Sequence, residues 1–268
     1  EPVEHGSENR HAERPGAGVH QQHQIPLLQV LIRRKGDLVL LVHSGSRSFG
    51  MAVFGTVLDG FSGLDPDGLQ GRAYLEAHGD AVRWASLNRQ IIAERVADAL
   101  RADLRLICDA PHNLIEVHRD LLLHRKGAAK ANGPLVPLAG SRDALSYLLS
   151  PRSDKPGAVA SLAHGSGRKY DRRSMTGRAG ATRSDRASLV RTSFGVQVIC
   201  EDRQLLIEEA PSAYKDPGQV LDDLRSHGLA DCVAALKPLL TFKKAISEDL
   251  LTARKDKRHR LTRRRAAR

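Results

Sequence analysis

The chain has 268 residues, of which 27% are charged and 4% aromatic, and a formal net charge of +11. This length can bury a large core, and because no linker-like stretch divides the chain, we expect a single domain. No apolar run approaches the roughly 20 residues of a membrane span, and the N-terminus lacks the basic-then-apolar layout of a signal peptide. The sequence therefore predicts a cytoplasmic protein without membrane association.

The cysteines and aromatic residues exclude two further classes. Cys108, Cys200 and Cys232 lie far apart among apolar neighbours, a pattern that predicts buried, reduced thiols rather than a disulfide framework. The low aromatic content leaves no alternation of basic and aromatic residues of the kind that stacks single-stranded bases.

Both ends of the chain are predicted to lie outside the folded domain, which we place at residues 25–247. Residues 1–24 contain four histidines but almost nothing apolar, so we expect them to be disordered. Residues 248–268 form a basic tail, in which positions 254–268 alone carry +8 and leave +3 for the rest. Such a tail would attract nucleic acid in a salt-dependent way. The alternative is a solvated terminus without catalytic importance.

The first half of the domain is predicted to contain strands, a long helix and loops. Residues 37–42 contain the continuous apolar, branched run Leu38–Val42, which predicts a buried strand over 37–42 that leads to His43. Apolar residues at three- and four-residue steps predict an amphipathic helix over 74–101, with Asp80 as a cap and Trp84 in the core. Residues 104–108 are predicted to form a strand that leads into Asp109-Ala-Pro-His-Asn113.

The second half continues with short strands and irregular helices. Residues 165–191 are rich in Arg, Ser and Gly and are predicted to be an exposed basic segment. The predicted strands are 121–127 with its turn, 159–163, and a hairpin of 196–200 with 204–208; the predicted helices are 217–227 and 229–236. Since this order lacks a βαβ rhythm, the sequence favours an α+β fold of mixed sheets with peripheral helices.

Three histidines share one sequence context. His43, His112 and His164 each follow a predicted strand and precede small or polar residues. One such histidine would more often be a hydrogen-bonded structural residue, but three in the same context favour a common site. Imidazole binds borderline metals such as Mn²⁺ or Zn²⁺ and can also act as a nucleophile toward phosphorus. The pattern alone does not decide which histidine does which.

The residues after two of these histidines predict phosphate binding. Both Val42-His-Ser-Gly-Ser-Arg47 and Ala163-His-Gly-Ser-Gly-Arg168 combine glycines, hydroxyls and an arginine. Glycine lets backbone N–H groups approach an anion, and arginine offers a bidentate fork to phosphate oxygens. We therefore expect one phosphate site assembled from two parts of the chain.

Six motifs in order resemble the RtcB family of RNA ligases. The resemblance covers roughly residues 25–245. In detail, the sequence is most similar to the shorter branch of the family, which is associated with release factor H. The segments Trp84-Ala-Ser-Leu-Asn-Arg-Gln90 and Leu162–Lys169 carry this similarity. The motifs are Val42–Arg47, Asp109–Asn113, His124-Arg-Lys-Gly127, Gly140-Ser141, Ala163–Arg168 and Glu208-Glu-Ala-Pro-Ser-Ala-Tyr-Lys215.

The resemblance implies a GTP- and Mn²⁺-dependent RNA ligase of the RNA-repair or tRNA-splicing type. Such enzymes join an RNA 3′-phosphate or 2′,3′-cyclic phosphate to a 5′-hydroxyl end through a histidine–GMP intermediate. By match to the motifs, His164 would be the nucleophile, and His43 and His112 would bind manganese, with two ions in an intact site. We expect a monomer whose partners are GTP and RNA.

The resemblance also implies contacts with the nucleotide and with RNA phosphates. The implied nucleotide-binding residues are Ser141, Ser146, Tyr214, Lys243, Gly165 and Arg168. The implied RNA or phosphate contacts are Arg47, Asn113, Arg168 and Arg172. The alternatives for two of these are that Tyr214 packs in the core and that Lys243 is solvated.

Two segments of the family do not appear in this sequence. Family members carry, before the first histidine loop, an Asp-x-Gly-Cys-Gly segment with two metal ligands and a Gly-Asn-His segment with a third ligand and nucleotide contacts. We therefore expect an N-terminally truncated ligase domain. Two alternatives remain open at this point: a catalytically degenerate fragment that only binds RNA, and a generic metal-dependent phosphoesterase.

Overall fold

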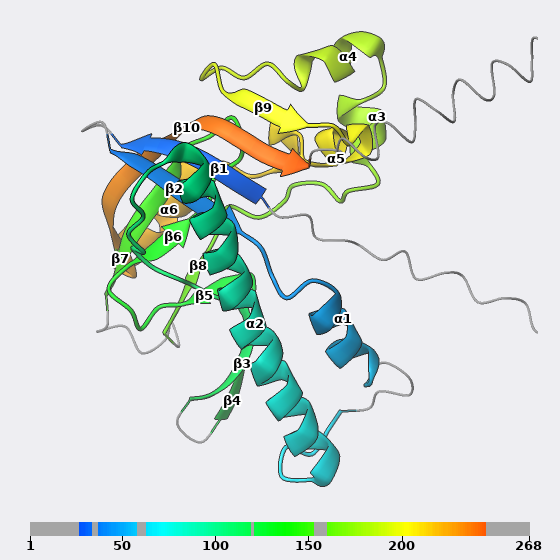
Figure 1. Ribbon diagram of the computed structural model, residues 1–268, viewed down its shortest axis with the longest axis vertical. Coiled ribbons are helices and arrows are strands. Elements are labelled where there is room, and N and C mark those ends of the chain that lie inside the picture. The colour runs from blue at the N-terminus through cyan, green and yellow to red at the C-terminus, as the bar shows by residue number, and fades with distance from the viewer. Residues whose placement is uncertain (1–26, 34–36, 58–62, 119–120, 153–159, 245–268) are drawn as a thin grey trace, which may run out of the picture.

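The structure, a computed structural model, describes residues 27–33, 37–57, 63–118, 121–152 and 160–244 (Figure 1). The predicted disordered segment 1–24 and the predicted basic tail 248–268 lie outside these residues. The described part combines antiparallel sheets with helices around them, which confirms the expected α+β class. None of its helices has both the length and the apolar character needed to cross a membrane.

The largest sheet has six strands and is built around one long strand. Its order is β2, β1, β10, β7, β6, and β9 also pairs with β10. All neighbours are antiparallel except β9 and β10. Register shifts along β10 accompany its curved course across the body (Figure 1). The bounds are β1 Leu27–Arg33, β2 Leu38–His43, β6 Val136–Leu138, β7 Ser146–Pro151, β9 Gln197–Cys200 and β10 Ala230–Lys244.

Two smaller pairs of strands bring distant loops together. β3 (Asn113–His118) and β4 (Leu121–Lys126) form an antiparallel hairpin. β5 (Ala128–Lys130) pairs with β8 (Ser161–Ala163), so that Ala128 lies opposite Ala163. The residues before β3, between β4 and β5, and after β8 are thereby held close to one another.

The main core lies between the large sheet and helix α6 (Pro217–Ser226). Asp216 caps this helix by accepting from the N–H of Gly218, and Pro217 occupies its first turn, where no N–H is needed. The helix buries apolar side chains against those of β6, β7, β8 and β10. This core contains Ala129, Val136, Leu138, Leu149, Leu162, Leu221, Leu224 and Ala230.

A second, smaller core holds the upper part of the molecule in Figure 1. It is made by short helices: α3 (Met175–Ala179), α4 (Arg183–Ser188), α5 (Arg203–Glu208) and the 3₁₀ turn Pro211–Ala213. Its buried members are Met175, Leu189, Ile207, Ala210 and Ala213. The predicted exposed basic segment 165–191 therefore contributes two core residues, Met175 and Leu189, although most of it is exposed.

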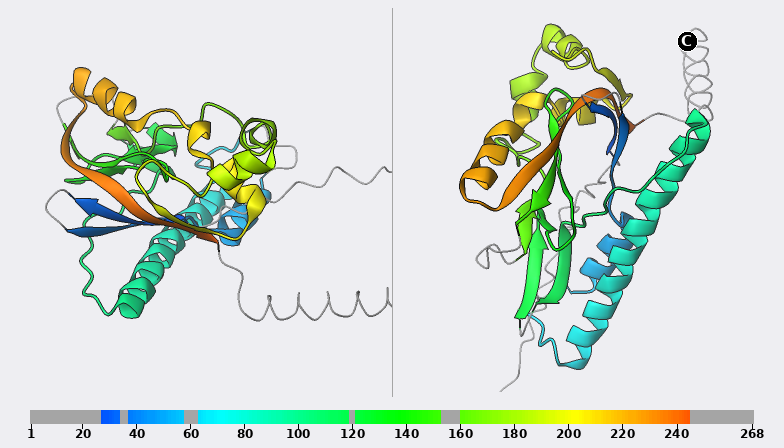
Figure 2. Two further views of the ribbon diagram at one scale, coloured as in Figure 1. Left: turned by 90° about the horizontal axis from the view of Figure 1, so that it is seen from above. Right: turned by 90° about the vertical axis from the view of Figure 1, so that its left-hand side faces the viewer.

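Two helices lie along the side of the sheets. α2 (Leu69–Leu100) is long and nearly straight, and α1 (Ser48–Gly55) lies beside its lower half (Figures 1 and 2). Within α2, only Gly71, Ala81 and Ala85 are buried. α1 contains no charged residue and none of its residues is buried, so Phe49, Met51 and Phe54 are exposed.

Three of the predicted elements are wrong. Residues 104–108 form no strand, because Leu104, Leu106 and Ile107 remain largely exposed and pair with no strand of the described residues. Residues 204–208 belong to α5, where the Asp202 side chain caps the helix by accepting from the N–H of Leu205. The predicted helix at 229–236 is the first half of β10, because pairing with β7 overrides the helical propensity of its Ala and Leu residues.

Several details within the predicted elements also need correction. α2 is confirmed but begins at Leu69 with Gly68 as its N-cap, so that Asp80 lies inside the helix. Trp84 is 46% exposed and is not a core residue. The strand predicted at 37–42 is confirmed as β2, yet it is half-buried rather than fully buried. All three cysteines are free, as predicted, but Cys232 is exposed and the other two are half-buried.

Candidate functional site

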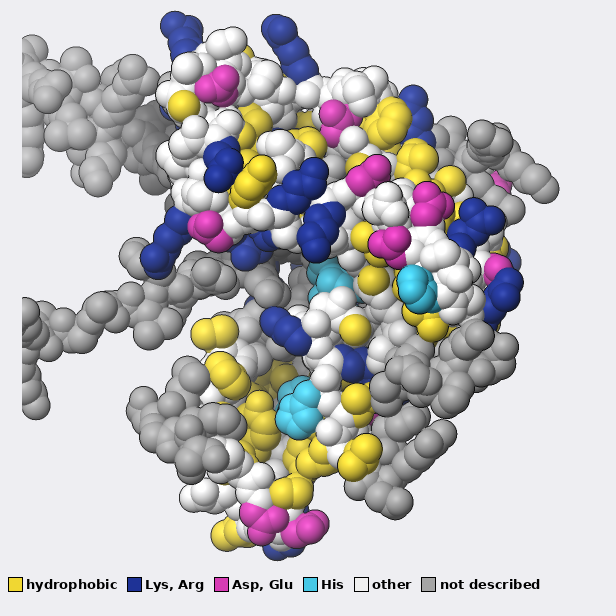
Figure 3. Space-filling model, turned by 180° about the vertical axis from the view of Figure 1, so that it is seen from behind, with side chains coloured by type: hydrophobic (Ala, Val, Ile, Leu, Met, Phe, Trp, Pro, Cys, Tyr) yellow, Lys and Arg dark blue, Asp and Glu magenta, His cyan; other side chains and the backbone are white. Residues whose placement is uncertain are grey.

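A cleft of about 690 Å³ opens where the loops at several strand ends meet. It is lined by residues that follow β2, precede β3, follow β6 and follow β8, and by the ends of β10 and α5. In Figure 3, a histidine side chain is visible in a hollow between the upper and lower parts of the molecule, with basic side chains around it. The cleft thus combines imidazoles with positive charge.

Three histidines meet at one end of this cleft. The potential ligand atoms of His43, His112 and His164 all lie within 4.8 Å of one another. The rings of His112 and His164 stack with centroids 3.6 Å apart, and the His43 ring stands edge-on to both. The sequence prediction that these three histidines share a site is confirmed.

The backbone of Gly127 fixes the orientation of His164. The carbonyl of Gly127 lies 2.7 Å from Nδ1 of His164, and because a carbonyl only accepts, Nδ1 carries the proton. Nε2 of His164 therefore keeps its lone pair. The N–H of Gly127 donates to the carbonyl of His112 at 2.8 Å, so the backbone of one residue connects the two histidine loops. Gly127 has a φ of +75°, which favours glycine.

Helix α2 holds the two other histidine loops in place. The Asn88 amide donates to the hydroxyl of Ser44, which follows His43. Arg89 donates to the carbonyl of Ser44 at 2.9 Å and forms a bidentate pair with Asp109 at 2.7 Å. Ser86 donates to the same carboxylate. These side chains of α2 join the loops of His43 and His112, a role that the sequence analysis did not detect.

The imidazoles fit a divalent transition metal. Burial lowers the pKa of His43 to about 4 and that of His112 to about 3, and the nearby His164 adds to both shifts. Burial also lowers the pKa of His164, against the opposing effect of its hydrogen bond to Gly127. All three are thus neutral near pH 7, which is the form that ligates a metal. Within the described ranges, this is the one cluster of His, Cys, Asp or Glu that could hold an ion.

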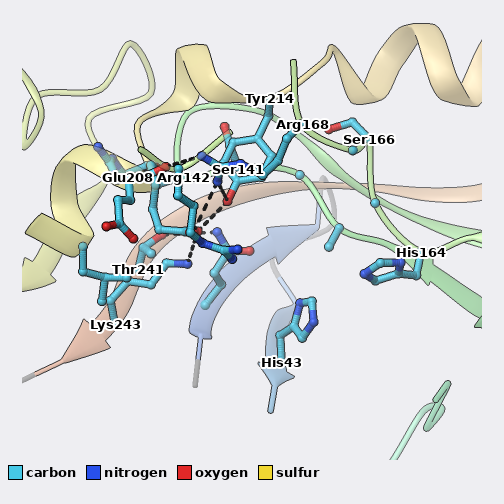
Figure 4. A pocket seen from close by; sticks show the side chains of 18 of the residues that line it. His43, Ser141, Arg142, His164, Ser166, Arg168, Glu208, Tyr214, Thr241 and Lys243 are labelled. Carbon is cyan, nitrogen blue, oxygen red and sulfur yellow. Dashed lines mark hydrogen bonds and ion pairs between the residues drawn. The ribbon is translucent and has the colours of Figure 1, made fainter. Parts of the chain in front are cut away.

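A buried carboxylate organises the other end of the cleft. Glu209 accepts from the Tyr214 hydroxyl and from Lys243, at 2.8 Å from Nζ. Arg168 and Arg172 approach the same carboxylate at 3.5 and 3.6 Å. Figure 4 shows His43 and His164 apart from the group formed by Tyr214, Arg168 and Lys243. Glu209 was quoted in a motif but given no role by the sequence analysis.

The basic residues of the cleft differ in how many of their donors are in use. Arg168 donates to the carbonyls of Tyr170 and Glu208 and to the Tyr214 hydroxyl, so most of its fork is occupied. Arg172 is 42% exposed, and among the residues that the structure describes its ion pair is the long contact with Glu209. Lys126 is exposed and lines the cleft close enough to His112 and His164 to disfavour their protonation. Lys126 was missed as a candidate, although it lies within the quoted motif His124–Gly127.

The structure places ten of the twelve predicted site residues on the cleft. Two lie elsewhere: Ser146 is buried and its hydroxyl accepts from the N–H of Gly140, while Arg47 starts α1 with a φ of +60° and does not line the cleft. Ser146 thus stabilises the loop that carries Ser141 without reaching the cleft. The ten residues on the cleft are His43, His112, Asn113, Ser141, His164, Gly165, Arg168, Arg172, Tyr214 and Lys243.

Comparison with known proteins decides the family. The sequence model of the family described as "tRNA-splicing ligase RtcB" matches residues 19–244. The chain belongs to the RtcB family. This confirms the resemblance found in the motifs.

Curated RtcB proteins are similar over most of this chain. The chain is 39% identical over 212 residues to the RNA-splicing ligase RtcB2 of Escherichia coli, covering 77% of this chain and 55% of that protein. It is 32% identical over 250 residues to the RNA-splicing ligase RtcB of Mycobacterium tuberculosis, covering 76% and 56%. The tRNA-splicing ligase RtcB of Archaeoglobus fulgidus is 30% identical over 258 residues, covering 76% and 52%. The chain therefore spans about half the length of the RtcB relatives that it matches.

Proposed function

We propose that this chain carries the nucleotidyl-transfer site of a GTP- and Mn²⁺-dependent RNA ligase. The ligase would join RNA ends bearing a 3′-phosphate or 2′,3′-cyclic phosphate to 5′-hydroxyl ends, in RNA repair or tRNA splicing, as a cytoplasmic monomer. Membership of the RtcB family supports RNA ligation as the general activity. The observation that carries the proposal is the state of His164: its Nδ1 is held by Gly127, and its Nε2 is left with a lone pair beside two further neutral imidazoles.

The first chemical step uses Nε2 of His164 as the nucleophile. Nε2 attacks the α-phosphorus of GTP, a P–N bond forms, and the P–O bond to the β-phosphate breaks as pyrophosphate leaves with the electron pair. The imidazole gains positive charge in this step. The Gly127 carbonyl, which accepts from Nδ1, stabilises that charge.

The remaining steps return His164 to its starting state. A 2′,3′-cyclic phosphate end would first take up water, which breaks the bond between phosphorus and the 2′-oxygen and leaves a 3′-phosphate and a 2′-hydroxyl. An oxygen of the RNA 3′-phosphate then attacks the phosphorus of the histidine-bound GMP, and the P–N bond breaks. The 5′-hydroxyl oxygen of the second RNA end then attacks the 3′-phosphorus, loses its proton and displaces GMP. His43 and His112 are the residues that would hold Mn²⁺, which supplies charge neutralisation at the phosphoryl group when bound.

The basic residues of the cleft would bind the phosphates. Arg172 and Lys126 have exposed donors that can reach an anion, whereas Arg168 mainly orients Tyr214 and the loop after His164. Ser141, Tyr214 and Lys243 line the part of the cleft that we assign to the guanine nucleotide. Asn113 and Gly165 line the floor near the histidines and would approach the transferred phosphate.

Covalent labelling tests this proposal. The protein is incubated with GTP labelled at the α-phosphate and Mn²⁺, and we expect an acid-labile label that is lost in His164→Ala. His227 is exposed and lies outside the cleft, so His227→Ala is the matched control and should keep the label. Absence of label in folded protein, while a full-length RtcB protein is labelled in parallel, would refute autonomous nucleotidyl transfer.

A role in RNA binding alone is the second candidate. It is favoured by the donor set at the histidine cluster, which contains no carboxylate or thiolate within the described residues. This role predicts RNA binding that weakens with salt, needs no GTP and survives His164→Ala. Filter binding at two salt concentrations, with and without GTP, distinguishes it from ligation.

A further inference from the structure

Glu209 is the central contact of the nucleotide end of the cleft. Its side chain is only 9% exposed, yet one ammonium, one phenol and two guanidinium groups lie within 3.6 Å of its two carboxylate oxygens. Burial alone would raise the pKa of Glu209, but Lys243, with the Tyr214 hydroxyl and Arg172, lowers it to about 2. The carboxylate is therefore ionised at every pH at which the protein functions.

The backbone of Glu209 is fixed as firmly as its side chain. The buried guanidinium of Arg142 donates to the carbonyl of Glu209 at 2.7 Å and to that of Leu206 at 3.1 Å. These two carbonyls lie at the C-terminal end of α5, where no intrahelical partner remains and a cation is favourable. Arg142 comes from the loop after Ser141, so the carboxylate has a set position relative to that loop.

The four partners of Glu209 are not held equally. Tyr214 and Lys243 make short hydrogen bonds to Oε2, whereas Arg168 and Arg172 lie 3.5 and 3.6 Å from Oε1. Arg168 also lies over the Tyr214 ring, 5.0 Å from its centroid. The short contacts fix the directions of the phenol and the ammonium, while the long contacts mainly offset the charge of the arginines.

From this geometry we infer that Glu209 is a positioning residue, whose carboxylate holds Tyr214 and Lys243 in the orientation that receives the base and sugar of the nucleotide. Glu209 does not touch the phosphates, because as an anion it opposes them. The inference rests on the proposed function, which assigns a guanine nucleotide to this end of the cleft. It predicts that removing the carboxylate weakens the binding of the base and sugar but does not weaken the binding of the phosphates.

The expected result is a split between GTP and inorganic triphosphate. In Glu209→Gln, Tyr214 and Lys243 lose a charged partner, so GTP should bind about ten- to hundredfold more weakly. Inorganic triphosphate should bind as tightly as before or more tightly, with a steeper salt dependence, because three cations lose their counter-charge. Isothermal titration calorimetry with both probes, at two salt concentrations, measures the split. If Glu209 had only a structural role, the variant would bind both GTP and triphosphate more weakly.

Two further variants make the test specific. Glu209→Asp keeps the charge but shortens the side chain, so it should weaken the binding of GTP and leave the binding of triphosphate unchanged. This variant also provides a test if Glu209→Gln folds poorly. Glu208→Gln is the matched control: Glu208 also lines the cleft, but its carboxylate accepts only from Gln204 among the described contacts. We expect Glu208→Gln to change the affinities for GTP and triphosphate in the same direction. An equal loss of both ligands in Glu209→Asp would overturn the inference.

A measurement without nucleotide separates this inference from the proposed function. Burial, together with the charge of Glu209, raises the pKa of Tyr214. Spectrophotometric titration of the tyrosines should therefore show one that ionises at lower pH in Glu209→Gln than in the wild type. If the wild type binds no GTP but the titration changes as expected, the proposed function fails and the positioning role stands. An unchanged titration overturns the positioning role, whatever GTP does.

Discussion

Replacing Gly140 with alanine should destabilise the loop that carries Ser141. Gly140 follows β6, and its N–H donates to the Ser146 hydroxyl at 2.9 Å. A Cβ at this position would lie 2.1 Å from the carbonyl oxygen and 2.7 Å from the carbonyl carbon of Leu145, and 2.9 Å from the carbonyl oxygen of Ala144. These are backbone atoms, which cannot rotate away as a side chain can. The loop would therefore have to open.

The magnitude follows from the cost of overpacking. Extra atoms in a packed site typically cost about 1–3 kcal/mol, and the backbone contacts here favour the upper end of that range. For a domain of this size, each kcal/mol lowers Tm by roughly 2–4 °C. We therefore expect the Tm of Gly140→Ala to fall by about 6–12 °C, measured by circular dichroism during heating.

A second glycine provides the control. Gly177 lies inside α3, and a Cβ there would meet nothing within 4 Å. Gly177→Ala should therefore stabilise the protein by about 0.5–1 kcal/mol, through the higher helix propensity of alanine. If both variants have the Tm of the wild type, the steric reasoning is wrong.

Three further predictions concern the cleft. His112→Ala removes one of three imidazoles, and Asp109→Asn breaks the ion pair with Arg89 that holds the loop of His112. Each variant should weaken Co²⁺ binding about tenfold or more, measured by visible absorption. An unchanged Co²⁺ affinity in both variants would exclude the cluster as a metal site. Lys126→Met should weaken RNA binding for all sequences alike and reduce its salt dependence, measured by filter binding; a sequence-dependent loss would contradict a phosphate contact. Because the pKa of Glu209 is lowered to about 2, the stability from its ionised form is present above its ordinary value of about 4.5 and is lost as the pH falls through 2. The difference in the free energy of unfolding between wild type and Glu209→Gln should therefore shrink over that pH range in urea titrations, and a difference that grows toward low pH would show the sign to be wrong.

Local sequence patterns predicted some elements and not others. The strand β2 and the helix α2 were predicted because continuous apolar residues and a 3.6-residue period are properties of short stretches. The first half of β10 has the composition of a helix, and it becomes a strand because β7, from a distant part of the chain, pairs with Ala230–Leu236. A short apolar run such as that of α5 fits either a helix or a strand, and the cap by Asp202 favours the helix. Pairing partners from distant parts of the chain are not visible in a local pattern.

The candidate site shows the same division. The three histidines were predicted to meet because their neighbouring residues are alike, although His112 follows an irregular segment rather than a strand. The residues that support them were missed, since Asn88 and Arg89 look like ordinary polar positions on a helix. Ser146 and Arg47 line no part of the cleft, because the direction of a side chain depends on the whole fold. Motifs thus predicted the residues that meet in the cleft better than the residues that hold their loops in place.

The backbone of Gly127 has a consequence for how this site changes over evolutionary time. Its carbonyl accepts from the imidazole of His164 and its N–H donates to the carbonyl of His112, and neither bond depends on a side chain at position 127. Replacement by any residue other than proline keeps both groups and can only strain the backbone, since the φ of +75° suits glycine. The tautomer of His164 is therefore buffered against most substitutions around it. A variant with changes elsewhere in the cleft would therefore still hold the imidazole of His164 in the same orientation.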